Sequence, residues 1–116
     1  MRLHVSIALA ALAVLPLVVT PSTSASGAFT VVATDFQFLP ETLVVPRGTT
    51  VTWIQGTAAF LPHTVTSAGL FDFEPGDVGT GNVIASYTFD QPTGSVILYS
   101  CKPHAILGMR GAIVVV

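Results

Sequence analysis

The chain has one cysteine, Cys101, among 116 residues. It therefore cannot form an internal disulfide, and it cannot hold an iron–sulfur cluster, which needs several cysteines. Charged residues make up only 9% of the chain and form no basic run, so we expect no nucleic-acid partner. No segment repeats its apolar residues with a sustained helical period, which argues against a helical domain. What remains is an apolar chain rich in β-branched residues.

The longest apolar run lies at the N-terminus. Residues 1–20 read MRLHVSIALAALAVLPLVVT, and the small-residue tail PSTSASGA follows them. A basic start, an apolar run and a tail of small residues form the pattern of a secretory signal peptide. Pro16 interrupts the run, which is shorter than the roughly 20 residues of a membrane-spanning helix. An uncleaved anchor is the alternative interpretation.

We therefore predict a signal peptide and cleavage region at residues 1–28, with cleavage after Ala25 or Ala28. The protein would then be secreted or periplasmic, with no stable membrane insertion after cleavage. The remaining residues, 29–116, are expected to form one domain.

Short segments rich in β-branched and aromatic residues fill this domain, and Gly, Pro, Asp and Asn separate them. The clearest alternation places Val51 and Trp53 on one side of a strand and Thr50 and Thr52 on the other. Several short strands in a small chain predict an all-β, two-sheet sandwich. A loop is expected between Gly69 and Gly81. The predicted strands are 29–34, 42–46, 49–54, 63–67, 83–89, 95–100 and 111–116.

The segment CKPHAILGMRG, residues 101–111, holds an unusual share of the metal-binding side chains. Cys101, His104 and Met109 follow the end of a predicted strand, and an intervening proline and glycine shape a tight loop. His63 is the remaining candidate, because His4 lies in the predicted signal peptide. Taken singly, such residues are more often surface histidines, buried thiols or core methionines. Their spacing and their place at a strand end favour a metal site.

Two imidazoles and one thiolate with a weak axial methionine form the donor set of a blue-copper electron-transfer site. Structural zinc usually takes four strong ligands, and a thioether is a poor one. The donor set therefore favours copper.

On these residues the chain resembles the cupredoxins, and most closely their plastocyanin and pseudoazurin branch. DFQFLPETLVVPRGTTVTW (35–53) is similar to the family's opening strands, and PHTVTS (62–67) to the segment that supplies its first histidine ligand. YSCKPHAILGMRGAIVVV (99–116) is similar to its ligand loop and last strand. Family members often have asparagine after the first histidine. This chain has Thr64, which would support the site either less firmly or through its hydroxyl.

The resemblance implies a Greek-key β-sandwich of about seven to eight strands. It also implies that His63, Cys101, His104 and Met109 bind one copper ion. The expected function is that of a type 1 copper protein, a small soluble one-electron carrier and not an enzyme. We expect a monomer whose redox protein partners dock at an apolar patch around His104. The neighbouring apolar residues are Phe60, Leu61, Pro62, Pro103, Ala105, Ile106 and Leu107.

Three alternative functions remain open for a chain with these residues. A copper carrier or chaperone of the secretory or periplasmic space would bind and release the metal, whereas a rigid ligand loop favours electron transfer. A copper-dependent oxidoreductase would need an open coordination position, which Met109 would guard. A purely structural sandwich would leave the complete set of four donors unexplained.

Overall fold

The computed structural model describes residues 28–57, 59–75 and 79–116. The predicted signal peptide lies outside them except for Ala28, which begins the first strand. No helix among the described residues is long and apolar enough to cross a membrane. The elements are β1 (Ala28–Thr34), β2 (Gln37–Leu39), β3 (Thr42–Val45), β4 (Thr49–Gln55), β5 (Val65–Ser67), β6 (Phe71–Phe73), β7 (Val83–Phe89), β8 (Val96–Ser100), the 3-10 helix η1 (Lys102–Leu107) and β9 (Arg110–Val115).

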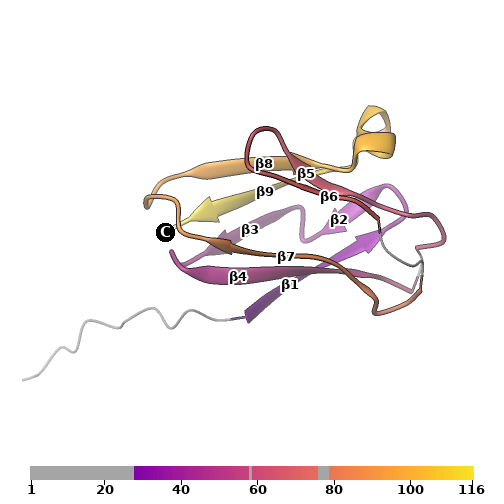
Figure 1. Cartoon of the computed structure of the whole chain (residues 1–116), viewed down its shortest axis with the longest axis horizontal. Coiled ribbons are helices and arrows are strands. Elements are labelled where there is room, and N and C mark those ends of the chain that lie inside the picture. Colours follow the sequence, from indigo (N-terminus) through magenta and orange to yellow (C-terminus); the bar gives the residue numbers. More distant parts are fainter. Residues whose placement is uncertain (1–27, 58, 76–78) are drawn as a thin grey trace, which may run out of the picture.

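The strands form two sheets that pack face to face (Figure 1). One sheet has the order β2-β1-β4-β7 and the other has the order β3-β9-β8-β5-β6. The pairs β1/β4 and β3/β9 are parallel, and the other pairs are antiparallel. Most connections, such as β3 to β4 and β7 to β8, cross from one sheet to the other. The predicted β-sandwich is confirmed.

The alternation predicted for β4 is also confirmed. Val51 and Trp53 are fully buried, while the Thr50 hydroxyl lies 2.7 Å from that of Thr88 on the outer face of β7. The Trp53 ring sits in the middle of the aromatic core and meets the Tyr99 ring edge-on, with 5.3 Å between ring centroids. Apolar burial between the two sheets is the main stabilising contribution to such a fold.

Two short strands were not predicted, and they account for the excess over seven. β2 follows β1 directly, and β6 lies within residues 69–81, where the sequence predicts a loop. The loop prediction was wrong for Phe71–Phe73, which pair with β5. Phe71 is buried, and its ring packs against the Tyr87 ring with 4.8 Å between the ring centroids. The surrounding Gly, Asp and Pro residues are typical of loops, so the sequence does not indicate this strand. The tertiary contact of Phe71 stabilises it.

β8 and β9 carry the C-terminal candidate ligands to one end of the sandwich. Tyr99 on β8 pairs with Gly111 on β9, and a Cβ atom at position 111 would lie 2.2 Å from Tyr99 Cζ. Glycine is therefore needed for the Tyr99 ring to lie across the neighbouring strand. Burial raises the pKa of Tyr99 to about 12, so the phenol stays neutral. Between the two strands, η1 projects from the end of the sandwich (Figure 1).

Candidate metal centre

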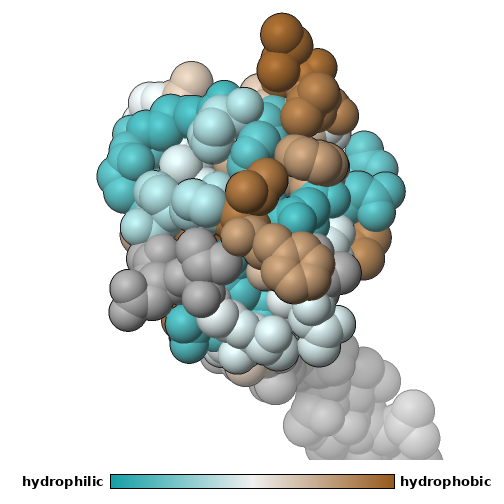
Figure 2. Space-filling model, turned by 90° about the vertical axis from the view of Figure 1, so that its right-hand side faces the viewer, coloured by the Kyte–Doolittle hydropathy of each residue, from teal (hydrophilic) through white to brown (hydrophobic). Residues whose placement is uncertain are grey.

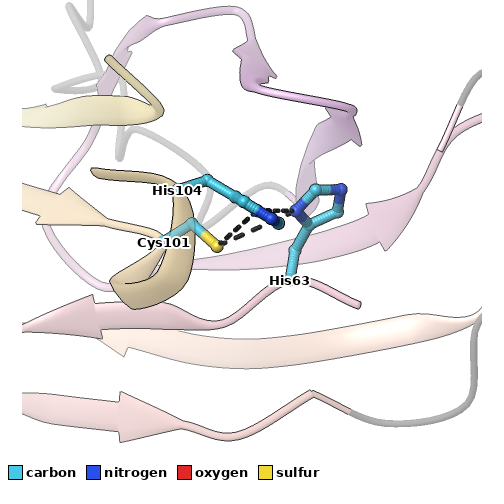
Figure 3. Close-up of side chains that lie close together, drawn as sticks. All are labelled: His63, Cys101 and His104. Carbon is cyan, nitrogen blue, oxygen red and sulfur yellow. Dashed lines mark hydrogen bonds between the residues drawn. The ribbon is translucent and has the colours of Figure 1, made fainter. Parts of the chain in front are cut away.

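Three of the four predicted ligands meet at the end of the sandwich beside η1. His63 comes from the loop between β4 and β5, two residues before β5 begins. The prediction that a strand begins at His63 was therefore wrong. Cys101 follows β8 directly, and His104 belongs to η1. Their side chains point toward one another (Figure 3), and one ligand atom of each lies within 4.8 Å of the others.

The distances among these atoms match a single bound ion. His63 Nδ1 lies 3.1 Å from His104 Nδ1, and Cys101 Sγ lies 3.4 Å from His104 Nδ1 and 3.8 Å from His63 Nδ1. The centre of this triangle is about 2.0 Å from each corner, close to the bonds of about 2.0 to 2.3 Å that imidazole nitrogen and thiolate sulfur make with zinc. The three atoms can therefore share one transition-metal ion.

The site is dry on the side of His63 and Cys101, and more open at His104. Cys101 and His63 are buried, while His104 is partly exposed. Burial lowers the pKa of His63, and the neighbouring His104 lowers it further, against the opposing effect of the Asp35 carboxylate. His63 is therefore neutral near pH 7, which is the form of imidazole that binds metals.

Met109 lies between η1 and β9 and is joined by backbone hydrogen bonds to two of the three residues. It is fully buried in the same core cluster as Cys101. The Cys101 N–H donates to the Met109 carbonyl at 3.1 Å, and the Met109 N–H donates to the His104 carbonyl at 3.2 Å. Gly108, with φ of 86°, turns the chain between η1 and Met109 in a left-handed conformation suited to glycine. The backbone thus joins Met109 to both neighbouring candidate ligands.

Thr64 links the two loops that carry the candidate ligands. Its backbone N–H donates to Cys101 Sγ at 3.4 Å, and its hydroxyl accepts the Lys102 N–H at 2.8 Å. The Thr66 hydroxyl lies 3.2 Å from that of Thr64 and donates its proton to Asp72 Oδ1 at 2.9 Å. Of the two alternatives that the sequence left open for Thr64, the structure favours support through the hydroxyl.

Two residues that sequence reasoning missed contact the histidines from the turn between β1 and β2. Asp35 Oδ1 lies 3.1 Å from His63 Nε2. The Phe36 ring meets the His104 ring edge-on, with centroids 5.2 Å apart. Phe36 also has φ of 71°, a conformation that is uncommon outside glycine and that often occurs at functional sites. Nothing in the local sequence indicates that these side chains reach residues so far along the chain.

The Asp35 carboxylate is ionised in this setting. Partial burial acts to raise its pKa, but the N–H groups of Phe60 and Leu61 and the His63 ring outweigh burial, so the pKa is lowered overall. Asp35 therefore places a negative charge one imidazole away from the centre of the triangle.

The lysine beside Cys101 is paired at the surface. Lys102 Nζ contacts Asp72 Oδ2 at 2.9 Å and also contacts Glu74. Glu74 and Asp72 raise the pKa of Lys102, and Lys102 lowers the pKa of Asp72. The positive charge nearest to the thiol is thus balanced by two carboxylates from β6 and the residue after it.

Comparison with known proteins shows that the chain matches a family of copper-binding proteins. Residues 25–116 match the sequence profile of a family described as "Copper binding proteins, plastocyanin/azurin family". The chain is 39% identical over 82 residues to halocyanin of Natronomonas pharaonis. That match covers 69% of this chain and 48% of halocyanin, so the chain spans about half the length of this relative.

Two solved structures show the same architecture. A purple cupredoxin from Nitrosopumilus maritimus has a TM-score of 0.63 at 23% identity, covering 76% of this chain and 99% of that one, and supports the fold alone. A variant of amicyanin in its reduced Cu(I) form has a TM-score of 0.60 at 30% identity, covering 78% of this chain and 83% of that chain.

The hydrogen bonds of Thr64 generate a prediction about the metal-free protein. Thr64→Val keeps the shape of the side chain but leaves the Lys102 N–H without its acceptor. We expect the free energy of unfolding to fall by about 1 kcal/mol, the net contribution of a partly buried hydrogen bond. Urea unfolding followed by tryptophan fluorescence measures this loss. Thr64→Ser, which retains the hydroxyl, is the control and should lose less; equal losses in both variants would contradict the role of the hydroxyl.

Proposed function

Because the chain belongs to the plastocyanin/azurin family of copper-binding proteins, we propose that it is a small one-electron carrier. Copper, the cofactor of this family, is bound by His63, Cys101, His104 and Met109 in this proposal. The observation that carries it is the convergence of one buried sulfur and two Nδ1 atoms on a single point.

The donor set fits copper better than zinc. The thiolate and two imidazoles suit either metal, but Met109 offers only a weak thioether as the fourth group. When bound, copper supplies the chemistry, since it alternates between two oxidation states that differ by one electron. The chain's own contribution is to hold the four donors still and to exclude water from the sulfur.

Rigid placement of the donors follows from contacts within the two loops. Thr64 joins the loops, the Cys101 N–H is bonded to the Met109 carbonyl, and η1 is closed by backbone hydrogen bonds. A frame that resists movement lowers the energy of reorganisation when an electron arrives or leaves, because the donor atoms shift little. The Thr64 N–H also donates to the sulfur, and such a bond is one of the factors that tune the potential of blue-copper sites.

Burial separates this function from copper delivery. A carrier that hands copper to a partner must expose ligands that the partner's own ligands can attack. Here Cys101 and Met109 have no exposed surface and His63 has almost none. Retention of the metal, with exchange of electrons only, fits this geometry better than transfer of the ion or catalysis at an open position.

An exposed apolar surface surrounds His104, which we call the His104 patch. Ile106 is 91% exposed and Phe60 is 78% exposed. Figure 2 shows apolar side chains gathered on this end of the molecule, interrupted by hydrophilic ones. Exposed apolar surface of this kind marks interaction sites. The patch consists of Phe36, Phe60, Leu61, Ile106 and Leu107.

We assign the patch as the surface where redox protein partners dock. His104 contacts the Phe36 ring of the patch and is the candidate ligand with the most exposure, so a docked partner would be one imidazole away from the metal. Small, weak contacts suit a transient redox complex. With Lys102 paired to its carboxylates, electrostatic steering toward the patch should be modest. We further propose a secreted or periplasmic monomer, in keeping with the predicted signal peptide.

The assignment predicts an intense blue colour. Protein loaded with one equivalent of Cu(II) should show a strong visible band from charge transfer between the Cys101 thiolate and the metal. Cys101→Ser should abolish the band, and Ser100→Ala, at the neighbouring position of β8, should leave it unchanged. Visible and EPR spectra test both variants. A colourless one-to-one Cu(II) complex of the unmodified protein would overturn the assignment.

Met109 should tune the potential more than it holds the metal. The thioether bond in blue-copper sites is long and weak, and it affects the relative stability of the two oxidation states. Met109→Leu should therefore keep copper and colour while raising the midpoint potential, measured by protein-film voltammetry. Loss of copper as severe as in Cys101→Ser would show that Met109 is needed for binding.

Docking at the His104 patch predicts slower electron exchange in charged variants. Ile106→Glu and Leu107→Glu should reduce the rate of electron self-exchange between reduced and oxidised copies at least tenfold, measured by NMR line broadening, with an unchanged visible spectrum. Val96→Glu is the matched control. It adds the same charge at an exposed apolar position on β8, at the end of the strand remote from Cys101. If all three variants exchange electrons as fast as the unmodified protein, electron transfer occurs at another face.

A further inference from the structure

Asp35 makes contacts that extend beyond its partner histidine. Its Oδ1 atom lies 3.1 Å from His63 Nε2 and accepts the N–H groups of Phe60 at 3.1 Å and Leu61 at 3.2 Å. The second oxygen, Oδ2, adds only a further contact to the Phe60 N–H at 3.1 Å. One carboxylate oxygen therefore gathers three groups of the loop that carries His63.

The contact with His63 decides which ring nitrogen carries the proton. A carboxylate accepts hydrogen bonds, so the His63 Nε2 atom must be the protonated donor. The opposite nitrogen, Nδ1, then has a free lone pair, and it is Nδ1 that faces Cys101 and His104. A metal-binding histidine whose other nitrogen donates to a carboxylate is oriented by it and becomes a more basic ligand.

We propose that Asp35 is a positioning residue that holds His63 in the tautomer required for copper binding, and that its charge lowers the reduction potential of the site. The proposal rests on the copper-binding function proposed above. Oxidation adds one positive charge to the site, and the fixed negative charge of Asp35 stabilises that state more than the reduced one. Because Asp35 is next to a fully buried imidazole, solvent screens this interaction only in part.

The competing interpretation is that Asp35 only braces the loop. The Phe60 and Leu61 N–H groups both donate to Asp35, and the Gln55 side chain also holds the same loop by donating to the Leu61 carbonyl at 3.2 Å. A brace requires hydrogen-bond acceptance but no charge. The two roles can therefore be separated by a variant that keeps the acceptor and removes the charge.

Asp35→Asn is that variant. The amide oxygen can occupy the Oδ1 position and accept all three donors, because only the additional contact of the Phe60 N–H depends on Oδ2. We expect the blue spectrum to persist and the ratio of Cu(I) to Cu(II) affinity to rise at least tenfold. For a one-electron couple, this change corresponds to an increase of about 59 mV in midpoint potential.

Asp90→Asn is the control for net charge. Asp90 follows β7 at the opposite end of the sandwich, so the same loss of charge there should leave the potential almost unchanged. If Asp35→Asn and Asp90→Asn give the same potential as the unmodified protein, the electrostatic role of Asp35 is overturned. A colourless unmodified protein would instead refute the copper function itself, and the proposal with it.

The tautomer can be tested without any variant. ¹⁵N NMR of the metal-free protein should show His63 protonated at Nε2, with a slowly exchanging proton hydrogen-bonded to the carboxylate. Protonation at Nδ1, or an Nε2 proton that exchanges as fast as that of an exposed histidine, would overturn the positioning role. This measurement stands even if Asp35→Asn fails to fold.

Discussion

The hydrogen bond between the Lys102 N–H and the Thr64 hydroxyl is the link on which the candidate site depends. β5 and β8 share a single paired position, Thr66 with Ser100, so sheet pairing alone ties the two ligand loops weakly. Thr64 extends this contact past the ends of both strands, with its N–H on the sulfur and its hydroxyl on the next residue of the chain. The bond to the sulfur is buried and the bond from the Lys102 N–H is partly buried, so breaking the first would leave a buried polar atom without a partner. The sandwich brings the loops to one end, and Thr64 sets their separation.

The charged groups nearest to Cys101 along its contacts lie outside the apolar core that contains the sulfur. Cys101 lies in the apolar core cluster, which favours a dry site, and the His63 ring separates it from the Asp35 carboxylate. Outside the core, the Lys102 ammonium is balanced by acidic side chains. Two charged residues near the site thus have defined partners, because Lys102 is paired with carboxylates and Asp35 contacts one candidate ligand.

The same apolar loops serve burial and exposure. Residues of η1 and the loop before His63 cover the end of the sandwich over the candidate donors, yet Ile106 and Phe60 project into solvent. His104 lies where the two loops meet, partly covered by the edge of the Phe36 ring. An electron leaving through this imidazole would cross a short path from a dry site to an apolar surface. The positive φ at Phe36 is the backbone feature that accompanies this placement.

The amino-acid sequence by itself predicted the fold class and the inward alternation at Val51 and Trp53, because periodicity is a local property. It also singled out Cys101, His104 and Met109 by their spacing, and His63 as the remaining histidine outside the predicted signal peptide. Family resemblance added the expectation that these four residues bind one copper ion in a Greek-key sandwich. Only the tertiary structure decided the rest. β6 exists because Phe71 packs against Tyr87, and Asp35 acts on His63 although 28 positions separate them. Such contacts depend on how β1 and the loop before β5 are brought together by sheet pairing. They leave no local pattern in the sequence, since an aspartate that accepts buried hydrogen bonds has the same surroundings along the chain as one that faces water.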